Sequence, residues 1–287
     1  MKWVEISGTR STERFQFLQK QLADAGLPNQ VEFLEANSSN FEDILIEAQK
    51  HFDQIRVGPP FGEIAVGHIT HLTGLMVTLK SCDSFAKLNG TWWPRSFFYE
   101  GFLRELTSHA KTLELTASAL LVGSGAAMRA VFAALLKIGY SKFKISDRFE
   151  ERGLLLVQDL KKVYFNAEIE FIPPSGLTAL PGVHSILVNG TPLVKTNDLL
   201  DDLYYFNFFR PKGVVIDLNL IPLRPPLLDE AEANGATTIH GYELAAQTDV
   251  LWAREVLGTN LDLEKYRAGL KETLEKVPFD LSDFKSS

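Results

Sequence analysis

The stretch from Leu115 to Leu136 constrains the fold more than any other part of the chain, because it joins two kinds of secondary structure through glycines. Ala119 to Val122 is typical of a strand buried in a parallel sheet, and Ala127 to Leu136 is typical of an alanine-rich helix. Gly123-Ser-Gly125 separates the two, and Arg129 is charged, so the stretch is not predicted to cross a membrane. We expect a strand, a tight glycine turn and a helix.

Strands and helices alternate along the chain, which predicts an α/β fold. In the second half, further strands are predicted at Phe143–Ser146, Glu168–Ile172, Ser185–Val188 and Val214–Asp217. The first part is predicted to contain strands at Lys2–Ile6, Val31–Ala36 and Leu75–Leu79, and helices at Thr12–Ala25, Phe41–His51 and Phe97–Lys111. Three more helices are predicted at Leu227–Asn234, Glu243–Leu257 and Leu261–Lys276. We expect an N-terminal α/β domain over residues 1–105, a doubly wound parallel-sheet domain over 106–242, and helices within 243–287.

The composition is that of an ordinary globular protein, with 45% hydrophobic and 23% charged residues among 287. Acidic residues outnumber basic ones by 36 to 29, which gives a net charge of −7, and no cluster of lysine and arginine stands out. Nucleic acid is therefore not an expected partner. The N-terminus has no apolar signal sequence, so we expect a cytoplasmic protein that does not insert into a membrane.

The sequence offers few metal ligands. Cys82 is the only cysteine, which excludes a disulfide within the chain and a zinc site built from cysteines. His68 and His71 lie three residues apart, but no clear third ligand accompanies them, and zinc sites need three or four. We therefore expect no bound metal.

The glycine turn has the context of a dinucleotide-binding fingerprint, because it follows a strand and opens a helix. Gly123 permits the tight turn, and Gly125, which lacks a Cβ, lets the backbone approach a pyrophosphate at the helix N-terminus. Met128 replaces the third glycine of the usual pattern, but Asp147 stands 24 positions after Gly123, where a ribose-binding acid is expected. The predicted cofactor-binding residues here are Gly123, Ser124, Gly125, Ala126, Ala127 and Asp147. A turn that binds nothing and a methyltransferase are the alternatives.

Five segments resemble the shikimate/quinate dehydrogenase family, and together they extend over most of the chain. Gly123 to Ala130, GSGAAMRA, resembles the family's GAGGAARA, and Ser146-Asp-Arg148 lies where the family has N-R-T. Asn189-Gly-Thr191 is similar to the family's N-A-T-S. Asp217 to Leu228, DLNLIPLRPPLL, is similar to D-x-x-Y-x-P-x-x-T-P-L-L, and Gln247 matches the glutamine of G-x-x-M-L-x-x-Q.

This resemblance implies a two-domain enzyme with an N-terminal substrate domain, a Rossmann-type cofactor domain, and C-terminal helices that pack back onto the first domain. It also implies hydride transfer between NAD or NADP and a hydroxyl-bearing ring carbon of a small-molecule substrate. Arg148 would then contact the adenosine end of the cofactor, and Asn189, Gly190 and Thr191 would border its nicotinamide. The implied substrate contacts are Thr9, Ser11, Thr78 and Gln247. A homodimer is left open.

The lysine and aspartate that transfer the proton in this family are missing here. The lysine of the family's N-V-T-x-P-x-K-E falls on Gly62, and the aspartate of G-x-N-T-D-G-x-G falls on Pro94 or Phe98. A substrate-binding asparagine falls on Val77, and a tyrosine falls on Leu220. We therefore expect a substrate less polar than shikimate and leave the catalytic residue unassigned. Candidates by their proximity in sequence are Glu63, His68, His71, Lys80, Asp83 and Glu100.

Two other functions stay open at this point. The first is a catalytically silent dinucleotide-binding or regulatory protein of the same fold, and the second is a true shikimate dehydrogenase whose loops are shifted in the alignment. For the cofactor, Asp147 can accept hydrogen bonds from both ribose hydroxyls of NAD and would repel the 2′-phosphate of NADP. Arg148 and Arg152 act in the opposite direction. We expect NAD to be slightly favoured.

Overall fold

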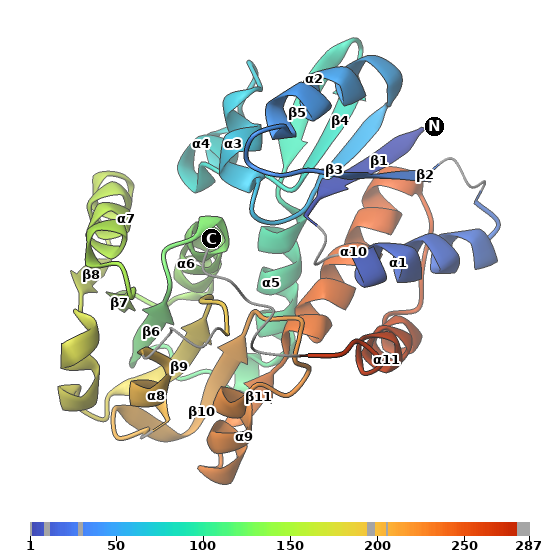
Figure 1. Cartoon of the computed structure of the whole chain (residues 1–287). Helices are drawn as coiled ribbons and strands as arrows, with labels where there is room; N and C mark the ends of the chain where they lie inside the picture. The colour runs from blue at the N-terminus through green and yellow to red at the C-terminus, as the bar shows by residue number, and fades with distance from the viewer. Residues whose placement is uncertain (1, 9–11, 28–30, 194–198, 205, 280–287) are drawn as a thin grey trace. The chain divides into compact units, whose positions relative to one another are not determined.

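A computed structural model describes residues 2–8, 12–27, 31–193, 199–204 and 206–279 of the chain (Figure 1). The chain divides into two compact units. The first unit contains Met1–Gly101 and Ala246–Leu274, and the second contains Phe102–Ala245 and Glu275–Ser287. The chain therefore passes from the first unit to the second within helix α5 (Phe97–Ser108) and returns within helix α10 (Gly241–Leu257).

The first unit is built on a five-stranded sheet with the strand order β2-β1-β3-β4-β5. Its strands are β1 (Trp3–Ser7), β2 (Val31–Glu35), β3 (Gln54–Val57), β4 (Ser84–Leu88) and β5 (Thr91–Arg95). The first three are parallel, and β4 and β5 form an antiparallel hairpin beside β3. Asn89 and Gly90 both have a positive φ, as a tight two-residue hairpin turn requires. The helices of this unit, besides its parts of α5 and α10, are α1 (Thr12–Asp24), α2 (Phe41–His51), α3 (Gly62–Gly67), α4 (Gly74–Leu79) and α11 (Leu263–Leu274).

The strand predicted at Leu75–Leu79 is wrong, because these residues belong to helix α4. Thr73 caps this helix, since its side chain accepts a hydrogen bond from the backbone N of Met76 at 3.3 Å. Met76 and Leu79 are three residues apart and both buried, which is helical spacing that a run of five residues is too short to reveal. Strands β3, β4 and β5 were not predicted.

The second unit is a six-stranded, fully parallel sheet with the strand order β11-β10-β9-β6-β7-β8. The strands are β6 (Ser118–Val122), β7 (Lys142–Ser146), β8 (Glu168–Phe171), β9 (His184–Asn189), β10 (Phe209–Asp217) and β11 (Thr237–Ile239). The helices are α6 (Ala126–Ile138), α7 (Glu150–Val163), α8 (Leu199–Leu203) and α9 (Pro226–Ala233), and η3 (Pro174–Ala179) is a short 3-10 helix. The five strands predicted for this part are confirmed as β6 to β10, and β11 was not predicted.

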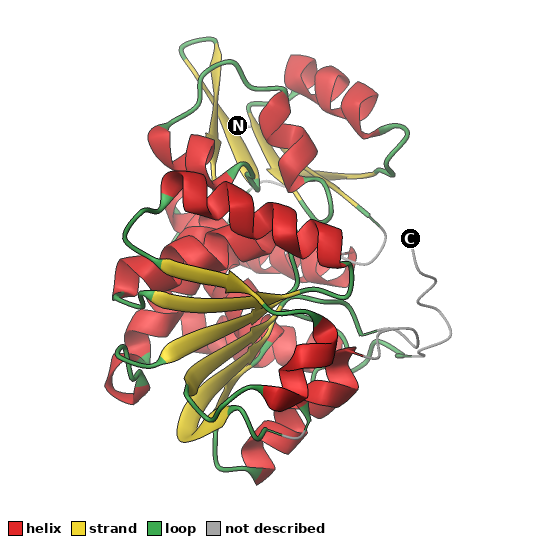
Figure 2. Cartoon of the chain, turned by 90° about the vertical axis from the view of Figure 1, so that its left-hand side faces the viewer, coloured by secondary structure: helices red, strands yellow, loops and turns green. Residues whose placement is uncertain are grey.

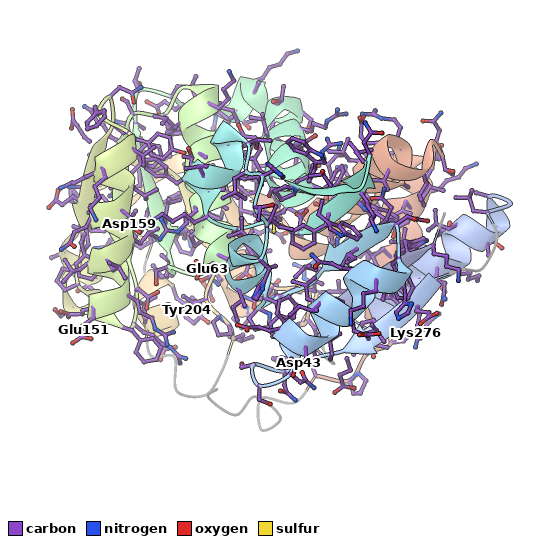
Figure 3. The ribbon with its side chains drawn as sticks, turned by 90° about the horizontal axis from the view of Figure 1, so that it is seen from above. Asp43, Glu63, Glu151, Asp159, Tyr204 and Lys276 are labelled. Carbon is purple, nitrogen blue, oxygen red and sulfur yellow. The ribbon has the colours of Figure 1, made fainter. Side chains whose placement is uncertain are left out.

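Helices cover both faces of this sheet, and Figure 2 shows its strands running side by side. On one face Phe132 of α6 packs against Phe143 of β7, with ring centroids 4.3 Å apart. Arg129 of α6 also forms an ion pair with Asp159 of α7, at 3.0 Å (Figure 3). On the other face the buried residues of β6, β9 and β10 pack against η3, α8 and α9. The predicted α/β fold with a doubly wound parallel sheet is confirmed.

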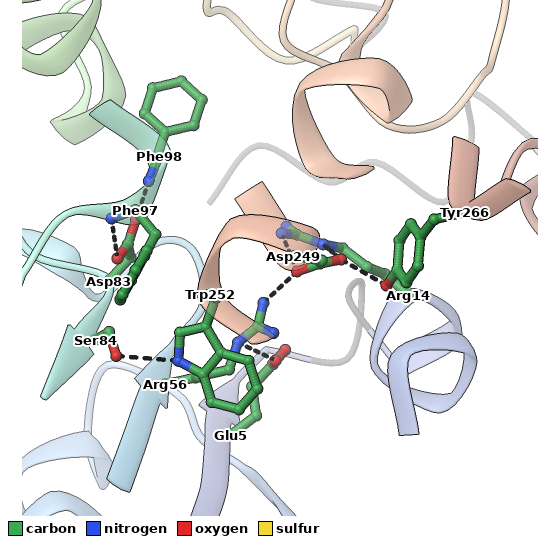
Figure 4. Close-up of polar contacts among 10 residues, drawn as sticks. All are labelled: Glu5, Arg14, Arg56, Asp83, Ser84, Phe97, Phe98, Asp249, Trp252 and Tyr266. Atoms are coloured by element: carbon green, nitrogen blue, oxygen red, sulfur yellow. Dashed lines mark hydrogen bonds and ion pairs between the residues drawn. The ribbon is translucent and has the colours of Figure 1, made fainter. Parts of the chain in front are cut away.

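Charged side chains are buried inside the first unit and satisfy one another (Figure 4). The carboxylate of Asp249 accepts hydrogen bonds from Arg14 at 2.8 and 2.9 Å, from Arg56 at 2.6 Å and from the Tyr266 hydroxyl at 3.0 Å. Arg56 also pairs with Glu5 at 3.2 Å. Burial opposes the charge of Asp249, but the two guanidinium groups outweigh it and hold the pKa of this carboxyl below its usual value. The network joins α10 to α1, α11 and the sheet.

Candidate functional site

In the second unit, the order of the sheet reverses between β6 and β9, because the chain continues from β6 to β7 on one side and from β9 to β10 on the other. In such sheets ligands bind beyond the carboxyl ends of the strands at this point of reversal. Gly123 follows β6 there, and Gly190 follows β9. The two predicted cofactor-binding segments therefore lie at one edge of one sheet.

Gly123 is required by its surroundings. Its φ is +112°, and its backbone N donates to Ser146 O at 2.8 Å. A Cβ at this position would lie 3.1 Å from the carbonyl carbon of Gly190 and 3.2 Å from Cγ2 of Thr191. The glycine turn and the Gly190–Thr191 segment thus pack directly on each other, and only glycine fits between them.

Gly125 has a different environment. It is the N-cap of α6, it is exposed, and a Cβ there would meet no atom within 4 Å. Ala126 and Ala127 begin the first turn of this 13-residue helix. The backbone N–H groups at the start of a helix have no hydrogen-bond acceptor within the helix. Open space in front of a helix N-terminus suits an anionic group, so these residues fit the pyrophosphate of a dinucleotide.

Asp147 connects the glycine turn to the loop after β7. Its carboxylate is 6% exposed and accepts hydrogen bonds from the Ser124 hydroxyl and from the backbone N of Phe149, both at 2.7 Å. The guanidinium carbons of Arg148 and Arg152 lie 4.5 and 4.8 Å from the ring centroid of the exposed Phe149. Asp147, Arg148 and Arg152 thus lie together around Phe149, between β7 and the first turn of α7, where the ribose contact is predicted.

The Gly190–Thr191 segment is held by a network that the sequence prediction missed. Asn189 Oδ1 accepts hydrogen bonds from the backbone N and the hydroxyl of Thr191, at 3.0 and 2.7 Å. Asp217, at the end of β10, accepts from Asn189 Nδ2 at 2.9 Å, and Asn219 contributes further bonds. Asp217 ends the predicted strand Val214–Asp217 and Asn219 lies two residues beyond it, but the pairing that brings Asp217 beside Asn189 is seen only in the folded sheet.

In the first unit, the position predicted for the missing lysine is Gly62, where an added side chain would crowd its neighbours. A Cβ on Gly62 would lie 2.5 Å from Ser81 Oγ and 3.0 Å from the carbonyl oxygen of Cys82. The position of the missing asparagine, Val77, is 56% exposed. Two further exposed apolar side chains come from the same pair of helices, Ile64 from α3 and Leu75 from α4. This part of the unit therefore presents hydrocarbon to its surroundings.

A titratable group lies beside the position predicted for the missing aspartate. Asp83 accepts hydrogen bonds from the backbone N of Phe97 at 2.8 Å and of Phe98 at 2.6 Å, at the start of α5 (Figure 4). Burial raises the pKa of Asp83 to about 6, against the opposing effect of these two hydrogen bonds. Among the candidates chosen by proximity, Asp83 is therefore held at the start of α5 by two backbone N–H groups, whereas Glu63 is exposed on α3 (Figure 3).

The other predicted substrate residues lie in the first unit. Thr78 is inside α4 and donates its hydroxyl proton to Gly74 O at 2.9 Å, and Gln247 is half-buried in α10. Thr9 and Ser11 lie outside the described residues. Their roles stay predictions.

The described part of the chain contains neither a candidate metal site nor a candidate membrane-spanning helix. Within it, no group of three or more His, Cys, Asp and Glu side chains is placed to hold a metal ion. In the same residues, no helix combines the length and the apolar character needed to cross a bilayer.

The chain is similar in sequence to shikimate dehydrogenases (NADP(+)). That of Nitrosopumilus maritimus is 30% identical over 145 residues, which make up 50% of this chain and 51% of the relative. That of Syntrophobacter fumaroxidans is 25% identical over 239 residues, or 82% of this chain and 80% of the relative. Matches to other curated shikimate dehydrogenases likewise span about half of their length. No family model matches the chain.

Solved structures share the fold over nearly the whole chain. The shikimate 5-dehydrogenase of Thermus thermophilus, in complex with NADP(H) and shikimate, has a TM-score of 0.76 at 21% identity and covers 96% of this chain and 100% of its own. The quinate dehydrogenase of Corynebacterium glutamicum, in complex with NAD, has a TM-score of 0.79 at 16% identity and covers 94% and 99%. At these identities the likeness concerns the fold.

The contact at Gly62 predicts that the two glycines of α3 differ in how far replacement by alanine changes the free energy of unfolding. We expect Gly62→Ala to lower the free energy of unfolding by about 1–3 kcal/mol, since the new methyl group collides with Ser81 and with the backbone of Cys82. Gly67→Ala is the matched control, because a Cβ there meets nothing within 4 Å. That change is expected to be neutral or stabilising by up to about 1 kcal/mol. Urea unfolding of both variants measures the difference, and equal stabilities would contradict the close contact.

Proposed function

We propose that this chain, which is similar to shikimate dehydrogenases in sequence and to shikimate and quinate dehydrogenases in fold, is an NAD(P)-dependent oxidoreductase acting on a hydroxyl-bearing carbon of a small molecule less polar than shikimate. The observation that carries this proposal is the glycine turn, which leaves Gly125 facing open space at the N-terminus of α6 while Gly123 packs on Gly190 and Thr191. A dinucleotide bound there would accept or supply the hydride.

In the second unit, different residues would bind different parts of the cofactor. Gly123, Ser124, Gly125, Ala126 and Ala127 would hold the pyrophosphate through backbone N–H groups and the helix terminus. Asp147 and Arg148 would contact the adenosine ribose, and Asn189, Gly190 and Thr191 would border the nicotinamide. The position of the glycine turn and of the Gly190–Thr191 segment at the point where the strand order reverses supports this assignment.

The altered substrate is supported by the first unit. A site that binds several hydroxyls needs a polar partner for each of them, and every partner lost there costs about 1.5–3 kcal/mol when a charged or polar group is left unpaired. Here the lysine position is closed by Ser81 and Cys82, and the asparagine position carries the exposed Val77. Apolar side chains at these positions favour a substrate with fewer hydroxyls than shikimate. Thr78 and Gln247 would supply the remaining polar contacts.

Asp83 is the group that we expect to exchange the proton. A carboxyl whose pKa is raised to about 6 by burial can both accept and return a proton near neutral pH. The backbone N–H groups of Phe97 and Phe98 already hold its carboxylate in one position, so proton exchange would need no rearrangement of this side chain.

A cytoplasmic location and a homodimer stay predictions.

Dinucleotide binding tests the proposal directly. We expect NADH or NADPH to bind the wild type, and we expect Gly125→Val to remove the binding without unfolding the protein, because the valine side chain fills the open space in front of α6 and touches nothing else within 4 Å at its Cβ. Calorimetry and circular dichroism measure the two effects. Gly67→Val, at another open position, should bind normally. A wild type that binds neither cofactor would end the oxidoreductase proposal.

The choice of cofactor gives a second prediction. We expect NAD to bind more tightly than NADP, because the buried Asp147 repels a 2′-phosphate, by up to about 4 kcal/mol for each pair of charges near 4 Å before screening. Asp147→Asn should narrow or reverse the preference in titrations with both cofactors. If the wild type prefers NADP and Asp147→Asn changes nothing, then Arg148 and Arg152 govern this site instead.

A true shikimate dehydrogenase is the second candidate, favoured by the names of the sequence relatives. We expect the purified protein to oxidise shikimate with NAD or NADP at below about 0.1 s⁻¹, since loss of positioned proton-transfer groups costs roughly 10²–10⁴-fold against a typical 10 s⁻¹. Turnover near 10 s⁻¹ would establish this second candidate. Dinucleotide binding without turnover of shikimate, quinate or less hydroxylated ring alcohols would indicate the catalytically silent alternative.

A further inference from the structure

Asp217 is a buried carboxylate whose hydrogen bonds, within the described part of the chain, come from amide groups. It is 2% exposed, and its Oδ2 accepts from Asn189 Nδ2 at 2.9 Å. Its Oδ1 accepts from the backbone N and from Nδ2 of Asn219, at 2.8 and 2.7 Å. An ionised carboxylate has acceptors only, so each neighbouring amide must turn an N–H towards it. Asp217 therefore fixes the orientation of both asparagine side chains.

That orientation determines what the asparagines offer to Thr191. Because Asn189 directs its amide nitrogen at Asp217, its oxygen faces Thr191 and accepts from the backbone N at 3.0 Å and from the hydroxyl at 2.7 Å. Asn219 Nδ2 donates to the carbonyl oxygen of Thr191 at 2.9 Å. The backbone N, the carbonyl oxygen and the hydroxyl of Thr191 are all held by groups that Asp217 orients.

Thr191 in turn packs against the glycine turn. A Cβ on Gly123 would come within 3.3 Å of both Cγ2 and the backbone N of Thr191, so the two segments are in contact. Gly190 is equally confined, since a Cβ there would lie 2.4 Å from Met128 Sδ of α6. A shift of Thr191 would therefore move the edge against which the turn is packed.

We propose that Asp217 is a positioning residue for dinucleotide binding, which acts through Asn189 and Asn219 to hold Thr191 against the glycine turn. Asp217 itself does not touch the dinucleotide. This inference rests on the proposed function, because it assumes that the turn binds NAD or NADP.

The first variant to measure is Asp217→Asn, with NADH and NADPH as probes. An asparagine at 217 brings its own N–H donors against those of Asn189 or Asn219, so one amide must turn away and Thr191 loses a partner. We expect the dissociation constant to rise about tenfold or more at a temperature where the variant is folded. Tyr140→Phe is the matched control, because it removes a buried hydrogen bond to Ser185 near the opposite end of β9. It should leave the affinity unchanged.

The reciprocal exchange separates positioning from general loss of structure. In the double variant Asn189→Asp with Asp217→Asn, the new carboxylate at 189 can still accept from Thr191 and from the amide at 217, whose oxygen can accept from Asn219. We expect this variant to recover most of the affinity that Asp217→Asn loses. If Asp217→Asn does not fold, the affinity of the double variant is compared with that of the wild type. A folded double variant without recovery, or equal affinities of Asp217→Asn and wild type, overturns the inference alone. A wild type that binds neither probe overturns the proposed function as well.

Discussion

A charge taken out of water must be met by hydrogen bonds, and in each unit one buried carboxylate meets this condition in a different way. In the first unit, Asp249 receives two guanidinium groups and a tyrosine hydroxyl, so neighbouring charges balance and the pKa of Asp249 is held below its usual value. In the second unit, Asp217 receives only neutral amides. Burial raises the pKa of Asp217 above its usual value, against the opposing effect of the hydrogen bonds from Asn189 and Asn219.

The two units differ in how far they keep the features of a dehydrogenase. The second unit keeps the glycine turn, the helix N-terminus and the segment after β9 at the point where the strand order reverses. The first unit keeps the sheet but fills the space beside Gly62 with Ser81 and Cys82. Under the proposed function, the second unit would supply a dinucleotide site, and the first unit would supply substrate contacts that differ from those of shikimate dehydrogenases.

The sequence was sufficient to locate strands β6 to β10, because each contains a short apolar run or an alternation of apolar and polar residues and is separated from the next by a helix or a loop. It was insufficient where an element is short or depends on a distant partner. Helix α4 was taken for a strand, since six residues give too little periodicity, and hairpin β4–β5 contains Pro94 and two tryptophans. For the site, the glycines and Asp147 could be located from spacing. The roles of Asp83 and Asp217 could not, because both depend on hydrogen bonds to neighbours that only folding brings together.

The first unit is interrupted in sequence by the second, and this affects the order in which the molecule can be completed during synthesis. Arg14 and Arg56 emerge from the ribosome early, whereas Asp249 follows nearly two hundred residues after Arg56. Until then the two arginines lack the carboxylate that joins them, and α10 cannot cover the sheet. The central part of the chain, Phe102–Ala245, is continuous and can fold as soon as it has been made. The nascent chain thus exposes an N-terminal sheet that α10 does not yet cover for as long as the ribosome needs to translate the central part.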